Sequence, residues 1–118
     1  MLREINITLN GAPFLKRAEI ARSFFERSRG LLGRSSLPVG HGLLLAPCSG
    51  IHTLGMKFPI DAIFLNGDGE VVRMVQNIRP GRFVVSGGRG ARVTLEIAAG
   101  WLSETAVRPG DNITWQPV

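Results

Sequence analysis

Apolar and polar residues alternate in several short runs along this chain. Residues 4–10 carry apolar side chains at every second position, and residues 92–97 repeat that pattern. A period of two is typical of a β-strand that buries one face and exposes the other. The pattern therefore predicts half-buried strands over both segments.

Turn-forming residues separate these runs. Asn10-Gly11 and Asn66-Gly67 each suit a tight turn, because Asn and Gly both tolerate positive φ. The second pair follows a strongly apolar strand predicted over 60–65 and precedes a returning strand over 70–75. Further strands are predicted over residues 13–21, 42–46, 83–86 and 113–115. The total is about eight short strands.

One segment predicts a helix instead. Ser23-Phe24-Phe25-Glu26 has the S-x-x-E form of a capping box, in which the two side chains bond orphan backbone N–H groups at a helix start. It predicts a short helix over about 24–32 that stops at Gly33. A further helical turn is predicted near 99–105. The predicted fold is therefore mainly β, a compact β-barrel or sandwich-like single domain over residues 1–118 with one short capping helix.

The composition fits a globular protein and excludes several other classes. The 118 residues are 44% apolar and 19% charged, with 14 basic and 9 acidic residues and a net charge of +5. A single cysteine excludes an internal disulfide framework. No apolar run approaches the roughly 20 residues of a membrane span. Because the chain starts without an apolar leader, it is predicted to be a soluble cytoplasmic protein.

Cys48 and His52 form a C-x3-H pair with three interpretations. Thiolate and imidazole both bind zinc and copper, although a metal site would also need a carboxylate such as Asp61 or Glu96. A thiol nucleophile with His52 as its base would use the same residues. In the favoured interpretation, Cys48 packs as a small apolar side chain and His52 hydrogen-bonds to a loop carbonyl. The sequence therefore predicts no metal and no cofactor.

Asp61 and Glu96 each interrupt a strand whose neighbouring residues are apolar. A carboxylate in such a strand faces solvent or is buried against a partner, because a lone buried charge is very costly. Arg27, Arg34 and Lys57 are the available cations. We expect either an Arg–carboxylate clamp that ties the helix to the barrel or a polar pocket wall for a small ligand.

Four arginines lie close together in a glycine-rich segment, at Arg79, Arg82, Arg89 and Arg92. Such a loop could contact phosphates. It offers only Phe83 for base stacking, and the chain has no tyrosine, whereas single-strand binders use several stacking aromatics. We therefore expect a solvated loop, with weak nucleic-acid binding as an alternative.

Five segments of the chain resemble the patterns of one known family. They are Arg27–Arg34 with Leu37, Gly42–Leu45, Gly55–Leu65, Leu95–Gly100 and Gly110-Asp111. In this order they resemble domain of unknown function 192, also called uncharacterised protein family 0127. The resemblance spans residues 17–114 and implies a compact β-rich fold with a short helix, without implying an activity. The sequence departs from the family at Phe58-Pro59, where the family has an Asn-Thr pair.

Taken together, these patterns predict a non-enzymatic binding or accessory domain with a polar pocket near Asp61 and Glu96. A small polar ligand is the predicted partner, and nucleic acid is not. The candidate pocket residues are Arg27, Arg34, Cys48, His52, Met56, Lys57, Asp61 and Glu96. One alternative is a metal- or thiol-dependent enzyme that uses Cys48, His52 and a carboxylate. The other is a weak nucleic-acid binder that uses the loop 79–92.

Overall fold

The computed structural model describes residues 2–118 of the chain. Its strands are β1 (Arg3–Leu9), β2 (Ala12–Pro13), β3 (Arg17–Ala21), β4 (His41–Leu45), β5 (Gly50–Ile51), β6 (Ile60–Leu65), β7 (Val71–Ile78), β8 (Val85–Ser86), β9 (Val93–Ala98) and β10 (Ile113–Pro117). Within these residues there is one α-helix, α1 (Phe24–Arg29), and one 3-10 turn, η1 (Leu102–Glu104). The predicted mainly β fold with one short helix is confirmed. Neither helical segment of the described chain is long and apolar enough to cross a membrane.

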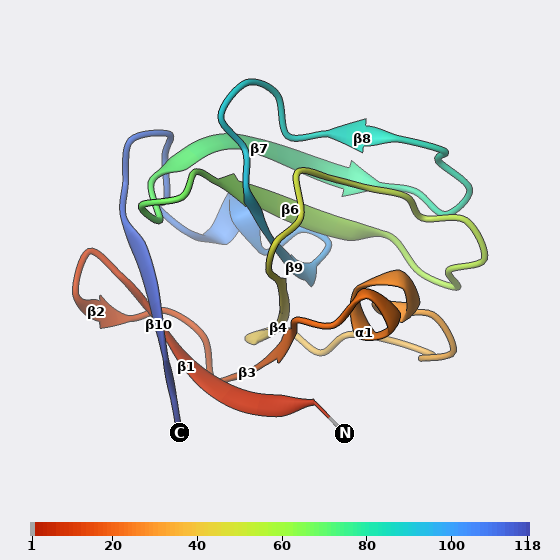
Figure 1. The fold of residues 1–118 in the computed structure, drawn as a ribbon, viewed down its shortest axis with the longest axis horizontal. Helices are drawn as coiled ribbons and strands as arrows, with labels where there is room; N and C mark the ends of the chain where they lie inside the picture. The colour runs from red at the N-terminus through yellow and green to blue at the C-terminus, as the bar shows by residue number, and fades with distance from the viewer. Residues whose placement is uncertain (1) are drawn as a thin grey trace.

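The main sheet curls into a half-barrel (Figure 1). Its strands follow the order β10-β1-β3-β4-β9-β6-β7, and only β3 and β4 pair in parallel along this path. A bridge between Glu70 and Asn112 joins the start of β7 to the segment before β10, which brings the two ends of the sheet together. The short strands β5 and β8 pair separately from the main sheet.

Two hydrophobic clusters lie on the two faces of the curled sheet. The inner cluster includes Ile63, Leu95 and Ile113, and the outer cluster includes Leu43 and Phe64. Loops and the segment after α1 cover the outer cluster, so both faces of the central strands are shielded from water. Burial of apolar surface on two faces is the main stabilising contribution expected for this architecture.

The segment 92–97 was predicted to be half-buried, and this prediction is wrong. Every residue of β9 is buried, because β9 lies between β4 and β6 and is covered on both faces. The strand predicted over 13–21 is also interrupted. It divides into β2 and β3, with residues 14–16 between them. The Phe14 N–H still donates to the Ile7 carbonyl of β1, and the Phe14 ring packs against Trp101 with ring centroids 4.9 Å apart.

The capping box at the start of α1 is confirmed. The Ser23 hydroxyl accepts a hydrogen bond from the Glu26 N–H at 3.0 Å, and the Glu26 carboxylate accepts from the Ser23 N–H at 3.2 Å. The helix ends at Arg29, earlier than the predicted residue 32. Gly30 adopts φ 49° and stops the helix, while Gly33 occupies a later turn.

Candidate functional site

A cavity of about 440 Å³ lies on the outer face of the half-barrel, between α1 and the segments around β5 and β8. The α1 side contributes Phe24, Arg27 and Arg29 to its lining. The Cys48–His52 segment forms another wall, and Glu96 of β9 lies against the cavity from the sheet. Residues far apart in the sequence therefore share one concave surface.

Thr53 joins the loop that follows β5 to the loop that precedes β8, beside this cavity. Its hydroxyl donates to the Arg79 carbonyl at 2.7 Å and accepts from the Arg82 N–H at 2.9 Å. The Thr53 N–H also donates to the Arg82 carbonyl. Because Thr53 is fully buried, these bonds form away from water and hold the β5 and β8 segments in a fixed relation.

The Cys48 backbone attaches the same wall to the sheet. Its N–H donates to the Arg92 carbonyl at 2.7 Å, and its carbonyl accepts from the Thr94 hydroxyl at 3.0 Å. The backbone at Cys48, which bounds the cavity, is therefore hydrogen-bonded to β9 and to Arg92, the residue directly before β9.

Glu96 is the buried acid of this site. Its side chain is on the outer face of β9, in register with Leu43 of β4 and Ala62 of β6. Only 3% of Glu96 is exposed, and its Oε1 has no hydrogen-bond partner among residues 2–118. Burial raises the pKa of the Glu96 carboxyl from 4.5 to about 8, and the positive charge of Arg34 opposes part of that rise. Glu96 is therefore mostly protonated at neutral pH.

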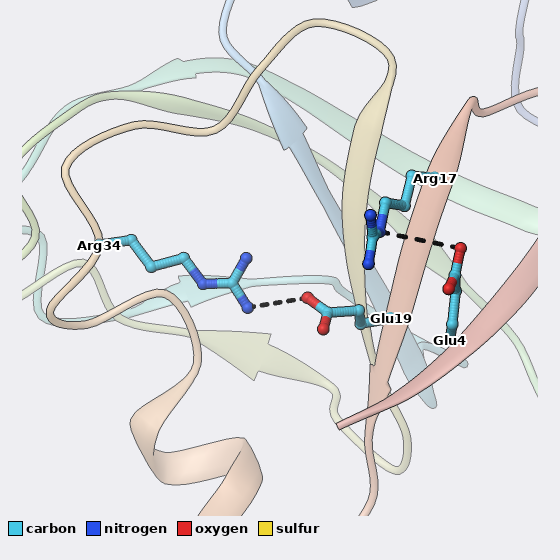
Figure 2. Close-up of polar contacts among 4 residues, drawn as sticks. All are labelled: Glu4, Arg17, Glu19 and Arg34. Atoms are coloured by element: carbon cyan, nitrogen blue, oxygen red, sulfur yellow. Dashed lines mark hydrogen bonds and ion pairs between the residues drawn. The ribbon is translucent and has the colours of Figure 1, made fainter. Parts of the chain in front are cut away.

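Arg34 does not form the expected clamp with Glu96 or Asp61. Figure 2 shows the Arg34 side chain directed from the loop after α1 toward Glu19 of β3, at 3.1 Å. The pair does tie the helical segment to the sheet, through a carboxylate that the sequence analysis overlooked. The second ion pair drawn there, Arg17–Glu4 at 3.7 Å, is exposed and contributes little stability.

Asp61 lies on the inner face of the sheet, away from the cavity. Its carboxylate accepts backbone N–H bonds from Asn77 at 2.8 Å, Gly100 at 3.1 Å and Leu102 at 3.0 Å. It thereby binds the start of η1 to the barrel interior. The reason is strand register: Asp61 is opposite Ile97, whereas Glu96 is opposite Ala62. Directly paired residues share a face and adjacent residues do not, so the expected pocket shared by Asp61 and Glu96 does not form.

Cys48 and His52 line the same cavity but bond to their own loop. The Cys48 thiol donates to the Gly50 carbonyl at 3.1 Å, and His52 Nδ1 accepts from the Leu54 N–H at 3.2 Å. The structure therefore shows His52 accepting from an amide, where a bond to a loop carbonyl was expected. Among residues 2–118, no group of three His, Cys, Asp or Glu side chains is placed to hold a metal ion.

The remaining candidate residues divide between the cavity and the surface. Met56 is buried and lines the cavity, whereas Lys57 is exposed and lies outside its lining. Arg27 donates through Nε to the Arg22 carbonyl and through Nη1 to the Pro47 carbonyl, both at 3.1 Å. It therefore attaches α1 to the cavity wall and places a positive charge there.

Comparison with known proteins identifies the family. The sequence profile of DUF192, described as an uncharacterized ACR, matches residues 5–115. The chain belongs to the DUF192 family. No curated protein matches the chain.

Two solved structures share the fold of this DUF192 protein. A protein of unknown function from Novosphingobium aromaticivorans DSM 12444 superposes with a TM-score of 0.83 at 24% identity, over 97% of this chain and 85% of that one. A protein from Sinorhizobium meliloti 1021, described as a candidate transcription regulator, superposes with a TM-score of 0.81 at 22% identity, over 98% and 94% of the two chains. At these identities the likeness shows the fold.

The sequence analysis missed the apolar rim of the cavity in this DUF192 protein. Phe24, Phe83 and Val84 line it while remaining 78%, 77% and 70% exposed. Large apolar side chains with so much exposed surface commonly mark a binding surface when they gather at one place. Their proximity could not be found from the sequence, because about 60 residues of chain separate Phe24 from Phe83.

Proposed function

We propose that this DUF192 protein is a non-enzymatic binding domain whose small-molecule ligand occupies the cavity between α1 and the β5 and β8 segments. The observation that carries the proposal is Glu96, which lies against the cavity while its Oε1 is buried and has no hydrogen-bond partner among residues 2–118. A buried polar atom without a hydrogen bond costs about 1–3 kcal/mol. A ligand atom that bonds to Glu96 would offset that cost, and the site would gain affinity from it.

The size and lining of the cavity support the same proposal. Its volume of about 440 Å³ lies within the roughly 300–1,000 Å³ range of small-molecule sites. Apolar side chains such as Leu45, Met56 and Phe83 form about half of its lining, and polar or charged side chains and two glycines form the rest. Sites of this composition bind the apolar body of a ligand and use the polar groups to orient it.

The geometry supports a thiol-dependent enzyme less well than it supports a binding domain. A nucleophilic thiol needs a base within hydrogen-bond reach, and a third group that orients the base. The Cys48 thiol donates to a carbonyl, His52 Nδ1 is bonded to an amide, and Asp61 is on the other face of the sheet. Binding without chemistry requires none of these arrangements.

A fragment screen tests the proposed function. Wild-type protein labelled with ¹⁵N is titrated with a library of small polar and aromatic fragments, and amide shift changes are mapped. We expect changes concentrated at residues 28–32 and 48–52. S28W places an indole on the cavity side of α1 and should abolish them, whereas S36W, outside the cavity lining, should not.

Thermal denaturation of both variants establishes that each is folded before the titration. The proposal is contradicted if no fragment shifts these amides at millimolar concentration. It is also contradicted if S28W binds every fragment as wild type does.

A further inference from the structure

Basic side chains outnumber acidic ones among the ionisable groups that line the cavity. They are Arg27, Arg29, Cys48, His52 and Glu96. Glu96 is the single acid among them, and two arginines oppose it. The ion pairs of the described residues, Arg17–Glu4 and Arg34–Glu19, involve neither cavity arginine, so their charges are not neutralised by a protein carboxylate.

The protonation state of Glu96 increases this imbalance. With its pKa near 8, the carboxyl is neutral at pH 7 and carries a hydrogen that it can donate. The cavity therefore presents two positive charges and a neutral donor. A cationic ligand would be repelled by both arginines and would have to draw the proton from Glu96. An anionic oxygen, in contrast, could accept the Glu96 hydrogen bond.

We infer that the cavity selects a small carboxylate with an apolar body, which accepts a hydrogen bond from the Glu96 carboxyl and is attracted by Arg27 and Arg29. This inference rests on the proposed function. A hydrogen bond to an ionised acceptor is shorter and stronger than one between neutral groups. It would also give a hydrogen-bond partner to the Glu96 side chain, whose Oε1 finds none among the residues that the structure describes.

The rim accounts for the apolar body of the ligand. Phe24 projects from α1, and Phe83 and Val84 come from the segment that leads into β8. All three side chains are mostly exposed to solvent, so a ligand that covers them would gain binding free energy from the burial of apolar surface. An aromatic acid combines this body with the required anionic group.

The groups around Glu96 determine how binding should depend on pH. Glu19 on β3 is paired with Arg34, and the directly opposite residues Leu43 and Ala62 are apolar. Facing the cavity are Arg27 and Arg29 of α1 and Cys48 and His52 of the β5 segment. Above pH 8 ionised Glu96 loses its hydrogen and repels a carboxylate, so affinity should fall.

Three ligands with one aromatic body test the inference: phenylacetate, phenylacetamide and phenethylamine. Dissociation constants are measured by NMR titration at pH 7 and pH 9. At pH 7 we expect phenylacetate to bind at least about tenfold tighter than the amide and the amine. Its affinity should fall by about tenfold at pH 9, whereas that of the amide should change little.

Variants assign this pH dependence to one side chain. E96Q keeps a neutral N–H donor, so it should retain phenylacetate binding at pH 7 and lose the fall at pH 9. E96L should lose the preference for phenylacetate altogether. C48S should keep the fall, which separates Glu96 from the nearby thiol. E104Q, at an exposed position of η1 outside the cavity lining, should behave as wild type.

The outcomes distinguish this inference from the proposed function. Equal affinities for the three ligands, or tightest binding of phenethylamine, would overturn the inference while leaving a binding cavity. A pH response that survives in E96Q or disappears in C48S would overturn it as well. If none of the three binds while S28W-sensitive fragments do, the cavity binds another chemistry. If no fragment binds, the proposed function has failed.

Discussion

At the residue scale, three acids occupy similar sequence contexts and have different roles. Glu19, Asp61 and Glu96 each lie between apolar neighbours in a strand. Glu19 pairs with Arg34, Asp61 accepts three backbone N–H bonds, and Glu96 has no partner for Oε1 in the described part of the chain. The difference arises from the face and register of each strand. Of these three acids, Glu96 lies against the cavity, and Glu19 and Asp61 do not.

Glu96 should make the stability of the protein fall as pH rises. Its pKa is about 8 when folded and near 4.5 when unfolded, so the native state holds the extra proton between these values. The free energy of unfolding should therefore decline between pH 4.5 and 8, by on the order of 5 kcal/mol from this group. E96Q should abolish that decline. Urea unfolding at several pH values measures it, and parallel profiles for the two proteins would contradict the expectation.

Asp61 should contribute stability through its three backbone donors. D61N replaces a carboxylate with two accepting oxygens by an amide with one. In either orientation its NH₂ faces at least one of the Asn77, Gly100 and Leu102 N–H groups and cannot accept from it, so D61N should destabilise the protein by about 2–3 kcal/mol. D68N, at an exposed position in the turn 66–69, is the matched control and should change stability by less than about 0.5 kcal/mol. Urea midpoints compare the two, and equal midpoints would show that the Asp61 bonds are not needed.

At the element scale, α1 is too short to be stable without its caps and tertiary contacts. It spans only Phe24–Arg29 and buries none of its own residues fully. Isolated helices of this length are not stable in water. Its position depends on the Ser23 capping box, on Arg27 bonds to backbone carbonyls, and on Leu31, which is buried just after it. The helix side of the cavity therefore depends on groups at the helix ends.

Ser23→Ala should cost about 1 kcal/mol, because it leaves the Glu26 N–H without its cap. Ser28 is exposed within the same helix, so S28A should be neutral or slightly stabilising. Thermal or urea unfolding of both variants gives the comparison. An unchanged S23A midpoint would mean that the cap does not limit the stability of the fold.

At the scale of the whole molecule, the half-barrel supplies a rigid surface on which two outer loops are assembled. The β5 and β8 segments pair with each other and do not join the main sheet. Thr53 holds their adjoining loops together through Arg79 and Arg82, and Gly87 lies against the Phe64 ring, where an added Cβ would be 2.5 Å from a ring carbon. The cavity wall therefore depends on contacts between distant parts of the chain.

Thr53→Val keeps the shape of the side chain and removes both hydroxyl bonds, so it should cost about 1–3 kcal/mol of local stability. Hydrogen exchange should accelerate at residues 81–87 while the β6 and β9 amides remain protected. T114V, which removes only a bond between exposed hydroxyls, should leave that segment unchanged. Uniform acceleration across the sheet in T53V would contradict a local role.

The sequence by itself determined the local structure of this protein. Alternation located β1 and β9, a strongly apolar run located β6, and Asn-Gly pairs located the turns. The capping box located the start of α1 to the residue, because each of these signals acts between residues only a few positions apart. The family resemblance was confirmed over residues 5–115.

The tertiary structure alone decided which face each strand presents to which partner. Period-two alternation shows which residues share a face of a strand. In a fully buried strand such as β9, it does not show which face packs against a loop and which face packs against the barrel interior. Asp61 and Glu96 were thus separated by a one-residue difference in register. The cavity likewise required three distant segments to meet. Such non-local contacts depend on how the sheet curls, and no short stretch of sequence specifies that curl.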